Sequence, residues 1–396
     1  MSEKVRVGAY FYPNEPSCPV RTERAGGIQV ESEPVLVRQT KPLFPGHDQP
    51  RSYCLGNSNI TDWDDSKTTI TNEHVTLAQE AGLNFFIIDS YLGIRSGKQI
   101  HESDGFLSQM SKMTILQLGN LHFGMMCCFK APRTIMSIRP GNLEMKREFD
   151  VSIDTARYIV DYSVAKWDHP NFLKINDRPY MSFFLPGTGA VGERSNDFNN
   201  FFDELKNYSY SEYKTVPYIV GVVSHRTPVT DAIAIEKIGV DAISGYSNIL
   251  NFPQSEPVVN HPSLIESRTQ EWEKISKVVS IPVEPTAQVG LDATPRCQYI
   301  DSKGKQFQPT SIDQLRPFIN QYPHSMIVTE STSETFTVLL DSLLKLTNDM
   351  QIPDNEKLIT INAWNEMSEG SCMLPRVYGE IVDFSFINSC RMLLTR

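Results

Sequence analysis

The chain has 396 residues, of which 40% are hydrophobic and 21% charged, so it can build a large core. Its formal net charge is −10 and it has no basic run, which argues against nucleic acid or an anionic membrane as a partner. No apolar run approaches the roughly 20 residues of a membrane span. The polar N-terminus shows no signal peptide and the seven cysteines are scattered, so we expect a cytoplasmic protein.

Short apolar runs, most of them separated by helical patterns, predict buried β-strands. They lie at residues 5–12, 84–90, 122–129, 179–185, 216–223, 241–246, 280–284 and 358–361. This alternation predicts an α/β fold, a (β/α)8 TIM-type barrel forming a single domain over residues 1–396. Long loop insertions are expected at about residues 14–70 and 247–310. The alternative is an open doubly wound sheet, although no Gly-x-Gly-x-x-Gly motif follows the first strand.

Capping residues predict where two of the helices begin. Thr71 is placed to cap a helix that Gly82 ends. Ser331 and Glu334 have the spacing of a capping box in front of the apolar stripe 336–344. Further helices are expected near residues 153–164, 231–238 and 266–278.

In a parallel barrel, the side chains that act on a substrate lie at the carboxyl ends of the strands. The groups that the sequence places there are aromatic, acidic or amide-bearing, a combination that suits carbohydrate, because rings stack on sugar faces while carboxylates and amides bind hydroxyls. The predicted residues of this face are Tyr10, Tyr12, Asp89, Tyr91, Lys130, His225, Arg226, Tyr246, Glu284, Trp364 and Asn365.

The last predicted strand leads into the stretch Asn362-Ala-Trp-Asn-Glu-Met-Ser-Glu-Gly370, here called the final motif. Glu366 and Glu369 lie three residues apart, so on a tight turn both carboxylates share one side, about 5–6 Å apart at Cβ. Two close carboxylates disfavour double ionisation, which raises one pKa and suits acid/base work on a glycosidic bond. The other interpretation is an acidic turn that caps the next helix.

Two loops add three further candidate site residues, each with a structural alternative. His47 lies in a Pro-Gly loop that either folds over the barrel mouth or turns for shape alone. Asp292 and Arg296 either contact the ligand or form an ion pair that shapes their loop.

The candidates at the strand ends are equally open. Asp89 either binds sugar hydroxyls or satisfies backbone groups, and the tyrosines and Trp364 either stack on sugars or pack in the core. His225 beside Arg226 suits an anionic substituent. The triplet 62–64 is a D-x-D pattern, which holds a metal in nucleotide-sugar transferases, but its place in a polar loop before a helix indicates a solvated turn. We therefore expect no metal and no other cofactor.

Several stretches resemble the WbsX-like proteins, which are related to glycoside hydrolase family 99. KPLFPGHDQPR at 41–51 resembles their rPLFPGHyQPR, GLDATPR at 290–296 resembles GwDnTpR, and INAWNEMSEG at 361–370 resembles iNAWNEWaEG. Residues 71–91 and 167–179 resemble their next helix and strand and their hPnYlkidGrP segment. These matches occur in the family's order and span most of the chain.

The resemblance implies a (β/α)8 barrel and a retaining glycoside hydrolase that acts on an α-linked, mannoside-like oligo- or polysaccharide. By position, Glu366 would be the base acting on the sugar 2-hydroxyl and Glu369 the general acid. The implied route passes through a 1,2-anhydro sugar and needs no metal. Two alternatives stay open: a glycosyltransferase or transglycosylase of polysaccharide synthesis, and a non-catalytic glycan-binding barrel.

The sequence departs from the family pattern at three places. Met367 stands where the final motif of the family has Trp. Cys128-Phe-Lys-Ala-Pro-Arg133 replaces W-A-N-E-N-W after the third strand, and residues 14–23 replace a Trp-rich segment after the first. We therefore expect a cleft whose walls, and hence whose substrate, differ from those of family 99.

Overall fold

A computed structural model describes most of the chain. The described residues are 5–15, 33–47, 52–55, 63–95, 97–102, 104–128, 137–138, 150–185, 191–192, 194–223, 228–246, 257–297, 299–300, 306–307, 309–315 and 326–395.

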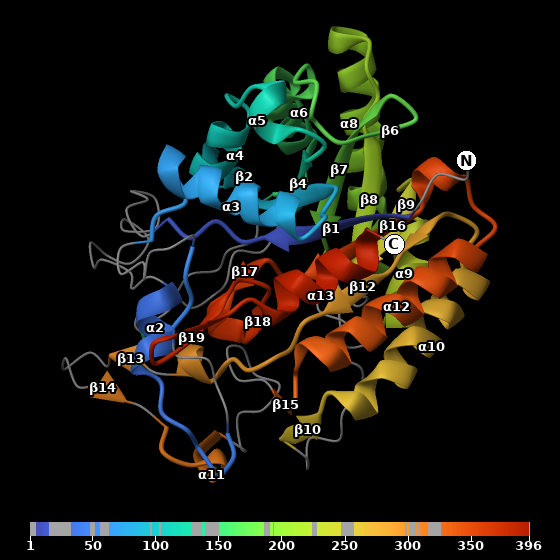
Figure 1. Cartoon of the computed structure of the whole chain (residues 1–396). Helices are drawn as coiled ribbons and strands as arrows, with labels where there is room; N and C mark the ends of the chain where they lie inside the picture. Colours follow the sequence, from blue (N-terminus) through green and yellow to red (C-terminus); the bar gives the residue numbers. More distant parts are fainter. Residues whose placement is uncertain are drawn as a thin grey trace.

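A nearly closed barrel of parallel strands forms the centre of the protein (Figure 1). The order around it is β11, β9, β8, β7, β4, β2, β1, β16, β12. These strands are β1 (Arg6–Phe11), β2 (Phe85–Arg95), β4 (His122–Cys128), β7 (Arg178–Phe184), β8 (Tyr218–Val223), β9 (Ala242–Gly245), β11 (Val283–Glu284), β12 (Thr286–Gln288) and β16 (Leu358–Asn362). Each predicted strand is present, and the predicted (β/α)8-type fold is confirmed. The prediction of a single domain over 1–396 stays a prediction.

The strand predicted at 280–284 is shorter than expected, and a second short strand completes its place in the barrel. Pro285 separates β11 from β12, and proline has no N–H to donate to a ladder. As a result, β11 pairs with β9 while β12 pairs with β16. The Pro285 carbonyl still accepts a hydrogen bond from the Thr360 N–H at 3.0 Å. The two short strands together bring the sheet round to its first edge.

Helices cover the outside of the barrel, and α10, α12 and α13 lie along one flank (Figure 1). The helices of at least nine residues are α3 (Thr68–Glu80), α6 (Ile153–Trp167), α8 (Ser195–Tyr213), α9 (Pro228–Glu236), α10 (Pro262–Val278), α12 (Ser333–Asp349) and α13 (Ser385–Leu394). Shorter ones are α2 (Glu33–Gln39), α4 (Gly105–Met110), α5 (Ile115–Leu118) and α11 (Ile312–Leu315). None of the described helices combines the length and apolarity needed to cross a bilayer.

Further short strands lie in the connections between the barrel elements. They are β3 (Lys98–Glu102), β5 (Ser137–Ile138), β6 (Lys174–Ile175), β10 (Val258–Asn260), β13 (Tyr299–Ile300), β14 (Gln306–Phe307), β15 (Ile327–Thr329), β17 (Asn365–Glu366), β18 (Ser371–Cys372), β19 (Arg376–Tyr378) and β20 (Ile381–Asp383). The predicted insertions contain secondary structure: α2 lies in the first, and β10 and α10 lie in the second.

Both predicted helix caps are wrong. Helix α3 begins one turn earlier than expected, after Lys67, and the Thr71 hydroxyl donates to carbonyls of the preceding turn instead. Helix α12 is capped by Thr332, whose capping-box partner is Thr335. Ser331 is not available for that role, because its hydroxyl donates to the Val289 carbonyl across the barrel rim. A tertiary contact thus occupies Ser331, whereas the bonds of Thr71 are local.

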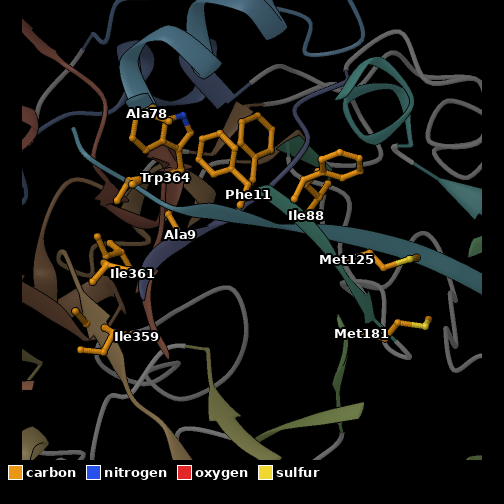
Figure 2. Packing of buried hydrophobic residues seen from close by; sticks show 14 of the residues in the cluster. Ala9, Phe11, Ala78, Ile88, Met125, Met181, Ile359, Ile361 and Trp364 are labelled. Carbon is orange, nitrogen blue, oxygen red and sulfur yellow. The ribbon is translucent and has the colours of Figure 1, made fainter. Parts of the chain in front are cut away.

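Strand residues alternate between two apolar clusters. In β16, Ile359 and Ile361 point outward into the larger cluster beneath the helices, part of which Figure 2 shows. Leu358 belongs instead to the cluster inside the barrel, which Tyr10 and Ile87 share. This alternation fixes which side chains at the strand ends face the barrel interior.

Gly8 of β1 gives the Phe85 ring its place inside the barrel. A Cβ at Gly8 would lie 2.1 Å from Phe85 Cδ2, and Phe85 is buried among other core side chains. We expect Gly8→Ala to lower the free energy of unfolding by about 1–3 kcal/mol, because overpacked cores must shift or strain. Urea denaturation provides the measurement. Gly192→Ala is the matched control, since nothing lies within 4 Å of its Cβ position; an equal loss in both variants would refute the packing argument.

Candidate active site

The final motif forms a small hairpin beyond the carboxyl end of β16. Strand β17 pairs with β18, and the 3-10 turn Met367–Glu369 joins them. Residues three apart on such a turn lie over one another, and Glu366 is the residue that begins it while Glu369 ends it. The two acidic side chains therefore come from one tight turn at the face where barrels carry out chemistry.

Asn365 ties this hairpin to the end of β1. Its Oδ1 accepts from the Tyr12 N–H at 2.9 Å, and its Nδ2 donates to the Tyr12 carbonyl at 2.7 Å. The amide thus acts like a strand partner for Tyr12. Both polar atoms of the Asn365 side chain therefore bind backbone atoms. For that reason Asn365, although predicted to bind substrate, is not among the residues to which we assign that role.

Trp364 anchors the hairpin in the core rather than facing a sugar. It is fully buried against Phe86, and its Nε1 donates to Nδ1 of His74 at 2.8 Å. With Nδ1 accepting, the second ring nitrogen of His74 donates to Asp65 Oδ1 at 2.9 Å. The packing alternative for Trp364 therefore holds. Sequence reasoning missed Asp65 and His74, because nothing in their local pattern links them to residue 364.

Arg296 connects the two acidic side chains. Its Nη1 pairs with Glu369 Oε1, and its Nη2 lies 3.9 Å from Glu366 Oε1. Its Nε donates to the Ser368 hydroxyl at 2.7 Å, so the guanidinium spans the turn from 366 to 369. Glu366 is buried, whereas the Glu369 side chain is 18% exposed, so Glu369 has the more accessible carboxylate.

His47 and Asp292 form a second pair that supports this arrangement. The Leu43 N–H donates to His47 Nδ1 at 3.0 Å, so Nε2 carries the proton and donates to Asp292 Oδ2 at 2.6 Å. The other Asp292 oxygen accepts from the N–H and hydroxyl of Thr294, which begins the 3-10 turn η1 (Thr294–Cys297) bearing Arg296. Of the two alternatives for Asp292 and Arg296, the mutual ion pair is not formed: among the described residues Asp292 pairs with His47, and Arg296 pairs with Glu369.

Gly370 allows the final motif and the 290–296 loop to touch. Its φ is +67°, and a Cβ there would lie 2.7 Å from the Asp292 nitrogen. The close approach lets the Asp292 N–H donate to the Glu369 carbonyl at 2.5 Å. Three of the five stretches that carried the family resemblance, 41–51, 290–296 and 361–370, are thus in contact.

A third carboxyl group faces the barrel mouth. Asp89 Oδ2 accepts from the Tyr246 hydroxyl at 2.9 Å, and the Tyr246 ring packs on Tyr10, 4.8 Å between centroids. Burial raises the pKa of Asp89 well above its ordinary range, and the charge of Glu369 raises it further. The pKa of Tyr91 is also raised, mainly by burial, with Asp89 and Glu366 among its neighbours. These groups therefore share one acidic environment.

Two residues predicted for the rim lie deeper. Tyr10 is fully buried inside the barrel, where its hydroxyl lies 3.2 Å from that of Ser244. Glu284 is also fully buried and accepts from the Tyr180 hydroxyl at 2.8 Å. Glu284 does end β11, but the chain passes Pro285 and continues as β12, so Glu284 lies below the rim and not at it.

Met367 does not line the cleft. It is 1% exposed and belongs to the outer core cluster, so the change from the family's Trp affects packing behind the turn and not the sugar-facing wall. His225, Arg226 and Lys130 lie outside the described residues. Among the residues that are described, no group of three or more His, Cys, Asp or Glu side chains could hold a metal ion.

The family model for the glycosyltransferase WbsX matches residues 32–381. The chain therefore belongs to the WbsX glycosyltransferase family, and the resemblance found in its motifs is confirmed. It is a carbohydrate-active enzyme on a TIM-type barrel. No curated protein sequence matches it significantly.

Solved structures of glycoside hydrolases share the fold. The family 99 endo-α-mannosidase from Bacteroides thetaiotaomicron, in complex with BIS-TRIS-propane, is 14% identical with a TM-score of 0.53, covering 97% of this chain and 95% of that one. A second structure of that enzyme is 13% identical with the same TM-score, covering 98% and 96%. A glycoside hydrolase-like protein is 10% identical with a TM-score of 0.60, covering 99% and 94%. At such identities the likeness shows the fold alone.

We expect His47→Ala to lower the free energy of unfolding by about 1–3 kcal/mol, because it removes the buried donor that satisfies Asp292. Urea denaturation measures the loss. His101→Ala is the control, since that exposed histidine makes a long contact, 3.4 Å, with the Tyr158 hydroxyl and lies 6.0 Å from the Tyr162 ring. If the two variants lose the same stability, the His47–Asp292 hydrogen bond does not stabilise the fold more than an exposed histidine does.

Glu284 predicts a pH dependence of stability. Burial raises its pKa from 4.5 to about 8, despite the hydrogen bond from Tyr180. Between these values the folded protein holds a proton that the unfolded chain releases, so stability falls by about 1.4 kcal/mol per pH unit from this group. Below the lower value the penalty is absent.

Glu284→Gln should remove that slope, since the amide can still accept from Tyr180 and never ionises. Chemical denaturation across this pH range should show the variant gaining on the wild type as the pH rises. Parallel curves for the two proteins would contradict a proton held on Glu284.

Proposed function

We propose that this protein is a retaining glycoside hydrolase that cleaves an α-linked, mannoside-like glycan with Glu366 and Glu369. The observation that carries the proposal is the placement of these two carboxylates on one tight turn beyond β16, with a single guanidinium reaching both. Paired acidic groups at the carboxyl end of a barrel strand suit acid/base work on a glycosidic bond.

The proposed reaction has two steps, with roles taken from the family 99 resemblance. In the first, Glu369 gives its proton to the glycosidic oxygen while Glu366 takes the proton of the 2-hydroxyl. The 2-oxygen attacks the anomeric carbon, the bond to the leaving oxygen breaks, and a 1,2-anhydro sugar forms. In the second, Glu369 takes a proton from water, the water oxygen opens the anhydro ring, and Glu366 returns its proton to the 2-oxygen.

The neighbourhood of the two carboxylates supports these roles. Glu366 is buried beneath the turn, where it can meet a sugar that enters the barrel mouth, while Glu369 lies at the more open side where a leaving group must depart. Arg296 supplies one positive charge against the two acids, which reduces the cost of keeping them close. His47 and Asp292 hold the loop that carries Arg296, so we assign them as positioning residues.

The second candidate is a glycosyltransferase or transglycosylase, which the family's description favours. The same two carboxylates would then act on an activated donor sugar. This reading predicts that product forms only when a nucleotide sugar or another activated donor is supplied, whereas hydrolysis needs only glycan and water.

The test is incubation of the purified protein with α-mannans and bacterial polysaccharides, with and without nucleotide sugars, and mass spectrometry of the products. We expect release of reducing oligosaccharides without any donor. Glu366→Gln and Glu369→Gln should each lower the rate at least about 10³-fold, because each removes a proton-transfer group that typically contributes 10²–10⁴-fold. Glu330→Gln is the control, since Glu330 is an exposed acid that lies outside the turn and accepts a hydrogen bond from Asn260.

Three outcomes would change the assignment. Product release that survives both substitutions would contradict the two-carboxylate mechanism. Product that appears only with a nucleotide sugar would favour the transferase. Glycan binding without turnover under any condition would favour a non-catalytic glycan-binding barrel.

A further inference from the structure

Polar side chains from neighbouring strands face the barrel interior below the final motif. Asn362 of β16 and Gln288 of β12 are in register, which puts their Cα atoms on adjacent strands, about 4.8 Å apart. Both alternate with outward residues, Ile361 and Ala287, so both point inward. Asp89 of β2 points inward by the same alternation, because Ile87 belongs to the interior cluster and Ile88 to the outer one.

These three residues lie close together around the barrel. In strand order, β2, β1, β16 and β12 are consecutive, so Asp89, Asn362 and Gln288 lie within three strand spacings. The residue that follows β1 in this arc is Tyr12, whose backbone Asn365 holds. Glu366 begins the turn only four residues beyond Asn362. The arc therefore forms the floor beneath the proposed catalytic pair.

Each of the three side chains has at least one polar atom that makes no hydrogen bond to the part of the chain that the structure describes. Asp89 Oδ1, Asn362 Nδ2, and both Gln288 side-chain atoms are buried without a partner. All three residues are at most 2% exposed. Leaving such buried groups unmet costs stability, and polar groups held this way at the mouth of a barrel are typical of a site built for a ligand.

We propose that Asp89, Asn362 and Gln288 form the subsite that binds one uncharged sugar unit through a pair of neighbouring hydroxyls. This inference rests on the proposed glycan-directed function and names the residues that would contact the sugar; no pattern in the sequence points to Gln288.

The donor and acceptor pattern selects an uncharged sugar. The two amide nitrogens donate, while Asp89 Oδ1 and Gln288 Oε1 accept, and a hydroxyl can satisfy one of each. A carboxylate, sulfate or phosphate only accepts, so it would leave both oxygens unmet. It would also approach the carboxylates of Glu366 and Glu369, where like charges repel.

The test is a binding measurement that does not need turnover. Methyl α-D-mannopyranoside is the neutral probe and D-mannuronate its charged counterpart, titrated by calorimetry and by saturation-transfer NMR. We expect the wild type to bind the neutral probe and to bind the uronate at least about tenfold more weakly. Gln288→Met should lower the affinity for the neutral probe about tenfold, because the substitution removes one donor and one acceptor while the side-chain volume changes little.

Stability separates a ligand-binding role from a structural one. If the Gln288 amide serves a ligand, Gln288→Met should be at least as stable as the wild type in urea, since an unmet buried amide is replaced by an apolar chain. Gln270→Met, an exposed change on α10, is the matched control and should alter neither quantity. Unchanged affinity in Gln288→Met, or a failure of every neutral probe to bind the wild type, would overturn the subsite.

A second variant covers the case in which Gln288→Met does not fold. Asp89→Asn keeps its shape and its acceptor for Tyr246, but places a donor where Oδ1 accepts. It should bind the neutral probe about tenfold more weakly, and wild-type affinity would refute the proposal. A wild type that binds sugar but never cleaves glycan would retain the subsite and reject the hydrolase, so the two failures can be told apart.

Discussion

The contact of one guanidinium with two acidic side chains organises the candidate site. Burying Glu366 beside Glu369 is costly unless a positive charge lies close, and Arg296 supplies it while also donating to Ser368. The turn at the end of β16 and the loop after β12 must therefore stay together. The other features of the site, from the Pro-Gly loop to the close approach at Gly370, serve to hold these two segments in contact.

A second network fixes the turn from behind. Trp364 donates a hydrogen bond to His74, which in turn donates to Asp65. The Asn365 side chain bonds the Tyr12 backbone as a neighbouring strand would. Side chains of the final motif thus divide into two groups. The aromatic and amide groups face the core and the backbone, while the acidic groups face the barrel mouth. Such a division is what preorganised chemistry requires, because the reacting groups are held by residues that are themselves locked by packing.

The barrel could be predicted from the sequence because each strand is a continuous apolar run, and buried parallel strands carry that pattern locally. The acidic pair could be predicted because its spacing and motif are local too. The cap at Ser331 could not, because its hydroxyl bonds the Val289 carbonyl, which only folding brings near; Thr71 instead lies within the first turn of its helix and bonds carbonyls just before it. The place of Glu284 depended on how a proline divides one strand between two neighbours.

The sequence by itself determined the family, the barrel and the two acidic residues, since these depend on patterns within short segments. Only the tertiary structure decided the partners. His47 binds Asp292 across 245 positions, and Arg296 turns from its neighbour in sequence to the acids of the final motif. It also decided that Trp364 packs instead of facing the mouth, and that Gln288 faces inward. Partners across a barrel follow from strand register and closure, which no local pattern encodes.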